Sequence, residues 1–147
     1  MNPELLIPEI MSPEVQAFAT GFPITLLHAG VTVVMLILGA ALYALLTPYK
    51  EISLIRDGNS AAAVAFGGVL IGLAIPLAVS LSASTSIREI AVWGAATIVV
   101  QLLVFRITDF LLTGLPSRIQ EGEVSAAVLL VAAKIATAII LAAAVAG

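Results

Sequence analysis

The sequence contains no cysteine and a single histidine, His28, among its 147 residues. The lack of cysteine excludes disulfides, thiolate nucleophiles and cysteine-ligated metal sites, and one histidine cannot form a multi-histidine metal centre. Charged residues make up only 10% of the chain, against about 25% in soluble domains. The six basic residues are scattered and the net charge is −3, which argues against a nucleic-acid interface. The sequence therefore predicts no metal, no other cofactor and no nucleic-acid partner.

What the sequence has in excess is apolar side chains, at 61% of residues and a mean hydropathy of +1.19. A soluble domain of this size could not bury so much apolar surface, because small domains hide only about two-thirds of what the unfolded chain exposes. Spanning a bilayer takes roughly 20 apolar residues, and four stretches are long enough. The sequence predicts an all-α polytopic membrane protein with four transmembrane helices, over about 23–46, 60–81, 86–113 and 124–147.

The predicted spans fall into two similar halves. A shift of 64 residues places Gly58 on Gly122 and residues 62–64 on residues 126–128. Both halves also share an order of apolar span, proline, charged connector, glycine and small-residue span. We therefore predict two tandem two-helix repeats, residues 23–83 and 84–147, inserted the same way up about an axis along the membrane normal. Residues 1–22 form an acidic, proline-punctuated leader that we expect to be interfacial or disordered.

Basic residues in the short loops predict the orientation. Lys50 and Arg56 lie in the first connector and Arg118 in the third, whereas the second loop has only Arg88. This bias predicts cytoplasmic first and third connectors and periplasmic termini in a bacterial inner membrane.

Ionisable residues at membrane depth indicate a functional region. Lys134 at the centre of the fourth span costs about 2.5–3.5 kcal/mol to insert, so it should need a partner on the third span. On an antiparallel neighbour, Lys134 lies near the level of Gln101, roughly two turns from Asp109, and a lysine stem covers much of that distance. Arg106 is spaced to pair with Asp109, and Glu123 is placed to approach Arg106. The predicted intramembrane polar network is Gln101, Arg106, Thr108, Asp109, Glu123 and Lys134.

This network has two interpretations. It is either an ion or proton path lining a cavity, or a structural set of charges that holds helices or subunits together. We favour the structural interpretation, because four helices enclose little space and the sequence places no second acid at the depth of Asp109. Glycines of the second span, Gly67, Gly68 and Gly72, are predicted to serve close helix packing first and an oligomer interface second.

The segment from Thr47 to Leu77 contains Ile55-Arg56-Asp57-Gly58-Asn59-Ser60, three alanines, Gly67-Gly68 and Gly72. It resembles the YjfL-type bacterial inner-membrane proteins, known as domain-of-unknown-function family 350. The resemblance covers about residues 23–147, and Gly58-Asn59 with the following small residues is its most specific part. It implies small multi-span proteins with a duplicated two-helix unit and fits an association with envelope stress. The second copy departs from the pattern, with Glu123 in place of Asn59 and Lys134 in place of Leu70.

The predicted function is that of a lipid-embedded, non-enzymatic protein. The sequence shows no nucleophile with a base, no water-accessible carboxylate pair and no phosphate-binding loop, so we expect no enzyme. We expect a homo-oligomerising scaffold, or a partner of another membrane or peripheral protein, in envelope maintenance. The alternative is a subunit of an ion or proton channel or transporter, with a polar path on the third and fourth helices.

Overall fold

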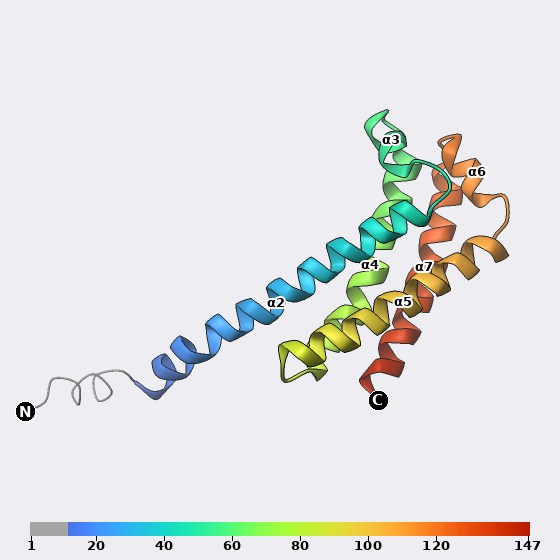
Figure 1. Ribbon diagram of the computed structural model, residues 1–147. Coiled ribbons are helices and arrows are strands. Elements are labelled where there is room, and N and C mark those ends of the chain that lie inside the picture. The colour runs from blue at the N-terminus through green and yellow to red at the C-terminus, as the bar shows by residue number, and fades with distance from the viewer. Residues whose placement is uncertain (1–11) are drawn as a thin grey trace, which may run out of the picture.

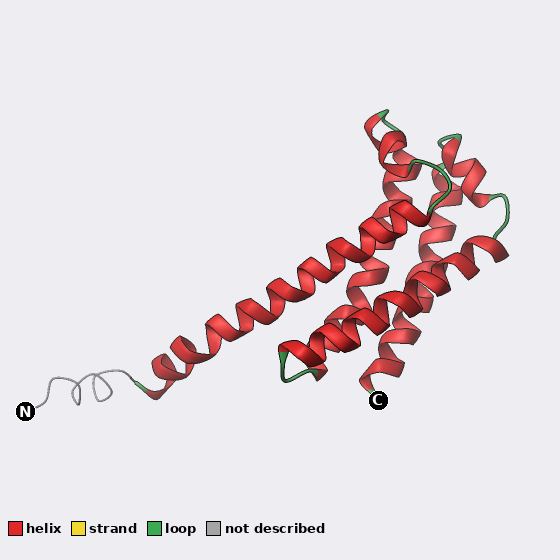
Figure 2. Cartoon of the chain, in the orientation of Figure 1, coloured by secondary structure: helices red, strands yellow, loops and turns green. Residues whose placement is uncertain are grey.

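The computed structural model describes residues 12–147, which form helices joined by short loops and contain no strand (Figure 2). Four of the helices are long and apolar enough to cross a membrane, as predicted. Two short helices form the connectors at one end of the bundle (Figure 1). The elements are α2 (Pro13–Leu46), α3 (Glu51–Arg56), α4 (Ser60–Ala83), α5 (Ile87–Leu111), α6 (Leu115–Gln120) and α7 (Val124–Ala146).

The first membrane helix is longer than expected. It begins at Pro13 and continues through Pro23 to Leu46, whereas the sequence suggested a span starting at Pro23. Ser12 occupies the N-cap and Pro13 the first turn, where a missing N–H costs nothing. Residues 13–22 of the expected leader are therefore helical and continuous with the first span, and residues 1–11 lie outside the described part of the chain.

Two glycines set the geometry of the connectors. Gly58 and Gly122 follow the short helices α3 and α6 and have φ angles of +89° and +87°. Glycine adopts this left-handed conformation without the steric penalty that a Cβ brings, so each chain can turn sharply into the next membrane helix. The bounds of α3 and α6, and the starts of α4 and α7, differ by the same 64 residues. The tandem duplication itself stays a prediction.

The centre of the bundle is the contact between α4 and α7, which pack on each other more than any other pair. Gly68 of α4 lies against Val131 of α7, and a Cβ on Gly68 would come within 2.8 Å of its Cγ1. One turn further on, Gly72 lies against the ring of Phe105 of α5. These glycines therefore bring helices of one protomer together, whereas Gly67 has open space beside it.

Among the described residues, no other helix lies beside the first half of α2. Gly39 approaches Ile98 and Met35 approaches Gly94, an offset of 59 residues in both pairs (98 − 39 and 94 − 35). By this offset His28 lies level with the start of α5 at Ile87. Residues 13–27 extend beyond that point by about 22 Å, at 1.5 Å per residue, and Figure 1 shows this segment leaving the bundle. Its large side chains are exposed, among them Phe18 at 61%.

Candidate intramembrane charge site

The third membrane helix, α5, presents one polar and one apolar side. Thr97, Gln101 and Thr108 are buried, with exposures of 3%, 0% and 8%. The opposite side is exposed and large, as expected for contact with lipid: Val92, Val99, Leu103, Ile107 and Phe110. The polar side of α5 therefore faces the other helices, and its Asp109 reaches the fourth membrane helix.

Lys134 of α7 is the centre of the site and only 1% exposed. Its Nζ lies 2.9 Å from Asp109 Oδ1, an ion pair by distance that lacks the angles of a hydrogen bond. The same nitrogen donates a hydrogen bond of 2.8 Å to the hydroxyl of Tyr43 on α2. It also lies 4.7 Å and 5.2 Å from the ring centres of Tyr43 and Phe105, where cation–π attraction adds stabilisation. Three membrane helices thus meet at one ammonium group.

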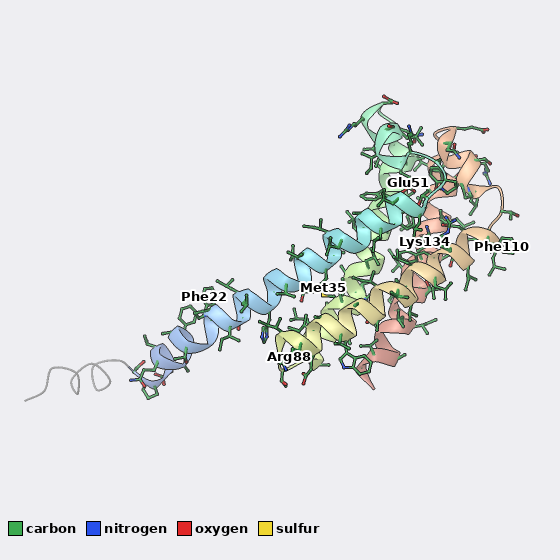
Figure 3. All side chains as sticks on the ribbon, in the orientation of Figure 1. Phe22, Met35, Glu51, Arg88, Phe110 and Lys134 are labelled. Carbon is green, nitrogen blue, oxygen red and sulfur yellow. The ribbon has the colours of Figure 1, made fainter. Side chains whose placement is uncertain are left out.

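A second carboxyl group joins this site from the connector. Glu51, at the start of α3, is 2% exposed, and the Tyr43 hydroxyl donates a long hydrogen bond of 3.4 Å to its Oε1. The other oxygen, Oε2, has no hydrogen-bond partner among the described residues. Figure 3 labels Glu51 and Lys134 at the same end of the bundle, far from Arg88. Asp109, Lys134, Tyr43 and Glu51 form what we term the charge site.

Sequence reasoning missed Glu51 and Tyr43. Glu51 lies in a connector with Lys50, Arg56 and Asp57, a composition typical of a solvated loop. The signal that could have identified it is the apolar pair Leu54 and Ile55, which packs α3 on the core formed by α4, α6 and α7. Because Leu54 and Ile55 pack α3 on this core, the first residue of α3, Glu51, lies in the protein interior.

Burial and neighbouring charges set the protonation of the connector groups. Burial raises the pKa of the Glu51 carboxyl above its ordinary value of 4.5, and the Lys134 ammonium opposes this rise in part. Burial also raises the pKa of Tyr49, with Glu51 and Asp109 adding to the rise. Two carboxyls share one buried ammonium, so a fully ionised site would hold an unbalanced negative charge. Uncompensated charge in a protein interior is costly, and proton binding at Glu51 removes it.

A cleft of about 630 Å³ opens beside the charge site at the connector end. Asp109 lines it, which connects the buried ion pair with the surface. The other residues that line it come from the end of α2, from α5 and from the α5–α6 connection: Thr47, Pro48, Tyr49, Arg106, Phe110, Thr113, Gly114, Pro116, Ser117 and Gln120. The site is therefore reached from one end of the bundle, through a passage with polar and apolar walls.

Other residues of the predicted network lie elsewhere. Glu123 does not approach Arg106. It forms an exposed ion pair with Arg118, whose Nε lies 2.6 Å from Oε2, and this partner five residues away was overlooked. Arg106 is exposed in the cleft, and Asp109 lies against Lys134 instead. The Thr108 hydroxyl donates to the Val104 carbonyl. Between residues 12 and 147, no three acidic or histidine side chains gather as metal ligands.

Asn59, from the Gly-Asn element, fastens the two connectors together. Its Oδ1 accepts a hydrogen bond of 2.9 Å from Ala62 N and so caps α4. Its Nδ2 donates to the carbonyls of Ile119 and Gln120, at 3.0 and 3.1 Å, at the end of α6. Carbonyls at a helix C-terminus lack hydrogen-bond partners within the helix. The one Asn59 side chain therefore supplies hydrogen bonds both to the C-terminus of α6 and to the N-terminus of α4. Glu123, at the matching place in the second half, makes no side-chain cap.

Comparison with known proteins gives a family and named relatives. Residues 17–145 match the family described as Domain of Unknown Function (DUF350). The UPF0719 inner membrane protein YjfL of Escherichia coli (strain K12) is 41% identical over 73 residues, covering 50% of this chain and 55% of the relative. The UPF0719 transmembrane protein YshE of Bacillus subtilis (strain 168) is 33% identical over 84 residues, covering 57% and 63%. These alignments thus span under two-thirds of each relative, and no solved structure matches the chain.

Proposed function

The chain belongs to the DUF350 family, whose matched relatives carry no activity in their names, and we propose from its geometry that it conducts protons across a membrane. The charge site is the proton-binding centre, and the cleft beside Asp109 admits protons from the connector end. The membrane is the bacterial inner membrane, the location that the YjfL name gives for that relative. The basic connectors face the cytoplasm and the termini the periplasm. No enzymatic step is involved.

The observation that carries this proposal is the second buried carboxyl group. A purely structural ion pair needs one acid for Lys134, and Asp109 supplies it. Glu51 adds an acid whose Oε2 has no partner among the described residues. Buried polar groups in native structures are nearly always hydrogen-bonded, so this oxygen is the expected place for an exchangeable proton or a water. The absence of a second acid was one of two grounds for preferring a structural role, beside the little space that four helices enclose, and Glu51 removes the first of them.

The contacts within the charge site suit proton transfer. The Tyr43 hydroxyl accepts a hydrogen bond from Lys134 and donates one to Glu51, so it joins the ammonium to the spare carboxyl. Asp109 lies on the other side of the ammonium and borders the cleft. A proton entering the cleft reaches Asp109 first, and rearrangement of these hydrogen bonds lets Asp109 and Glu51, both near the connector end, share it. Intramembrane proton relays use such acid–base chains.

A flux assay tests this proposal. The purified chain is placed in liposomes that contain a pH-sensitive dye, and a potassium gradient with valinomycin drives proton entry. We expect uptake above that of protein-free liposomes, and its loss in Asp109→Asn and Lys134→Met. The matched controls are Arg118→Gln and Glu123→Gln, which remove an exposed ion pair at the same end of the bundle and should leave the flux unchanged. Equal flux with and without the wild-type protein would refute proton conduction.

A second candidate, the oligomerising scaffold, is favoured by the first half of α2. Residues 13–27 extend past the bundle, and Phe18 and Phe22 stack with ring centres 4.8 Å apart on an exposed face. Gly68 and Gly72 cannot report on such an oligomer, because they pack within the protomer. The chain has no cysteine, so Phe18→Cys gives one cross-linking position, with exposed Ile140→Cys on α7 as the control. Cross-linking no stronger at position 18 than at 140 would argue against this scaffold.

A further inference from the structure

A line of buried polar side chains continues from the charge site toward the other end of the bundle. Gln101 lies two turns before Asp109 on α5, about 12 Å along the helix axis. It is 0% exposed, and neither its Oε1 nor its Nε2 has a hydrogen-bond partner among residues 12–147. An unpaired buried polar group costs about 1–3 kcal/mol, and Gln101 carries two such atoms. Its surroundings therefore lack something that can donate and accept hydrogen bonds.

A second unpaired group lies toward the far end of the bundle: Ser80 of α4 is 2% exposed and its Oγ has no hydrogen-bond partner among the described residues. Thr97, one turn before Gln101, is a further buried hydroxyl, 3% exposed. Ser80 borders a small cavity of about 60 Å³ at the end opposite the connectors. Ser84, Glu89 and Trp93 also line this cavity. A cavity of that size has room for about two waters, and its walls are polar enough to hold them.

The backbone between these points offers a further acceptor. Pro76 is buried within α4 and has no N–H. The carbonyl of Gly72, four residues earlier, therefore lacks its helical hydrogen bond at this point. Gly72 lies against Phe105, one turn from Gln101 on α5. The α4–α5 contact thus brings Gly72, whose carbonyl receives no hydrogen bond from residue 76, to within one helical turn of Gln101 along α5.

We propose that ordered waters bound by Gln101, Thr97 and Ser80 connect the charge site with the cavity at the opposite end. This water file rests on the proposed function, because it supplies the second half of the proton path that begins at the cleft. On α5, Thr97 and Gln101 are four residues or about 6 Å apart, whereas the apolar Phe105 lies between Gln101 and Asp109, which are about 12 Å apart. One water bridges the first gap between two polar groups, and a chain of at least two waters bridges the second. The ligand of this site is water, and protons move along it by exchange of hydrogen bonds.

Water contact can be measured without reference to flux. In water-edited solid-state NMR of the isotope-labelled chain in lipid bilayers, magnetisation passes from mobile water to side chains that touch it. We expect transfer to the Gln101 amide and to Ser80 Cβ, as strong as transfer to exposed Ser82 on the same helix. The internal control is Leu73, 1% exposed in an apolar part of the core, which should show none. Transfer at Gln101 and Ser80 no stronger than at Leu73 would overturn the proposal.

Flux measurements then separate this proposal from the proposed function. Gln101→Leu removes both unpaired atoms and should lower proton flux about tenfold, the factor that corresponds to a barrier raised by about 1.4 kcal/mol. Ser80→Ala should lower it in the same direction, and Ser82→Ala should not. Water contact in a wild-type protein without flux would refute conduction but leave the water file. Wild-type flux that neither substitution lowers would refute the file but leave conduction at the charge site.

Discussion

Two adjacent glycines of α4 allow a sharp test of the packing that holds the charge site together. Among the described residues, no neighbouring atom lies within 4 Å of a Cβ placed on Gly67, whereas a Cβ on Gly68 would come closest to Val131 Cγ2 and would lie 2.8 Å from Cγ1 and 2.9 Å from Cβ of the same valine. Ordinary van der Waals contact begins at 3.4 Å. In Gly68→Ala, α4 and α7 must therefore separate by at least about 0.6 Å, because the valine side chain is stiff at χ1.

The difference between the two alanine variants isolates this steric effect. Both substitutions gain the same helix propensity, about 1 kcal/mol, so that contribution cancels. Overpacking of a well-packed core costs about 1–3 kcal/mol. We expect the free energy of unfolding of Gly68→Ala to be lower than that of Gly67→Ala by that amount. For a chain of this size, each kcal/mol lowers Tm by about 2–4 °C.

Thermal unfolding in detergent, followed by circular dichroism, measures the effect. The valine can be removed to test its cause. Val131→Ala in the Gly68→Ala background should restore part of the lost stability, whereas in the Gly67→Ala background it should only destabilise. Equal stability of Gly67→Ala and Gly68→Ala would refute the close approach of α4 and α7 at this point.

Three further predictions concern the charge site and the connectors. Lys134→Met leaves the part-buried Asp109 without its partner and should cost up to about 3–5 kcal/mol, the range for a fully buried pair. Adding Asp109→Asn should recover much of this loss in a double-mutant cycle of chemical unfolding. Asn59→Ala loses the cap of α4 and both hydrogen bonds to α6, so it should lower the free energy of unfolding by at least the roughly 0.5–2 kcal/mol typical of a lost cap. Asn59→Asp keeps the cap and should cost less. An equal cost of the two substitutions would contradict the role of Nδ2. Because burial raises the pKa of Glu51, the folded state binds this proton more tightly, so stability should fall as pH rises from 4.5 through the raised value. Glu51→Gln should flatten that slope and stabilise the protein at neutral pH, and a pH profile unchanged by the substitution would contradict the buried position of the carboxyl.

The features that follow from local periodicity could be predicted from the sequence. Four apolar stretches gave four membrane-spanning helices, and the pattern of α5 separated its buried side, such as Gln101, from its lipid side, such as Phe110. That Lys134 needs a partner on the third span followed from the cost of an isolated charge in lipid, whereas the direct partner predicted for Asp109 was Arg106. Each of these depends on one helix or on one neighbouring pair.

The features that depend on tertiary packing were missed. Glu51 reads as a connector residue, and only the packing of α3 on the bundle buries it. Tyr43 joins the site because α2 passes beside α7's lysine, a contact between residues 91 apart. The start of α2 was misplaced because proline is common at the beginning of a helix. The helix continues through Pro23 because proline removes only one backbone hydrogen bond. Hydrogen bonds across such distances leave no trace in local composition.

The order of these residues along the chain has a consequence for biosynthesis. Tyr43, Glu51 and Asp109 all precede Lys134, so α2, α3 and α5 have left the ribosome before the lysine does. When α7 reaches the translocon, the groups that neutralise its ammonium are already available in the membrane. Lys134 can therefore pair with Asp109 and Tyr43 as soon as α7 enters the membrane, and its ammonium need not stay unpaired in lipid. The order of the helices along the sequence thus lowers the cost of inserting α7 with its lysine.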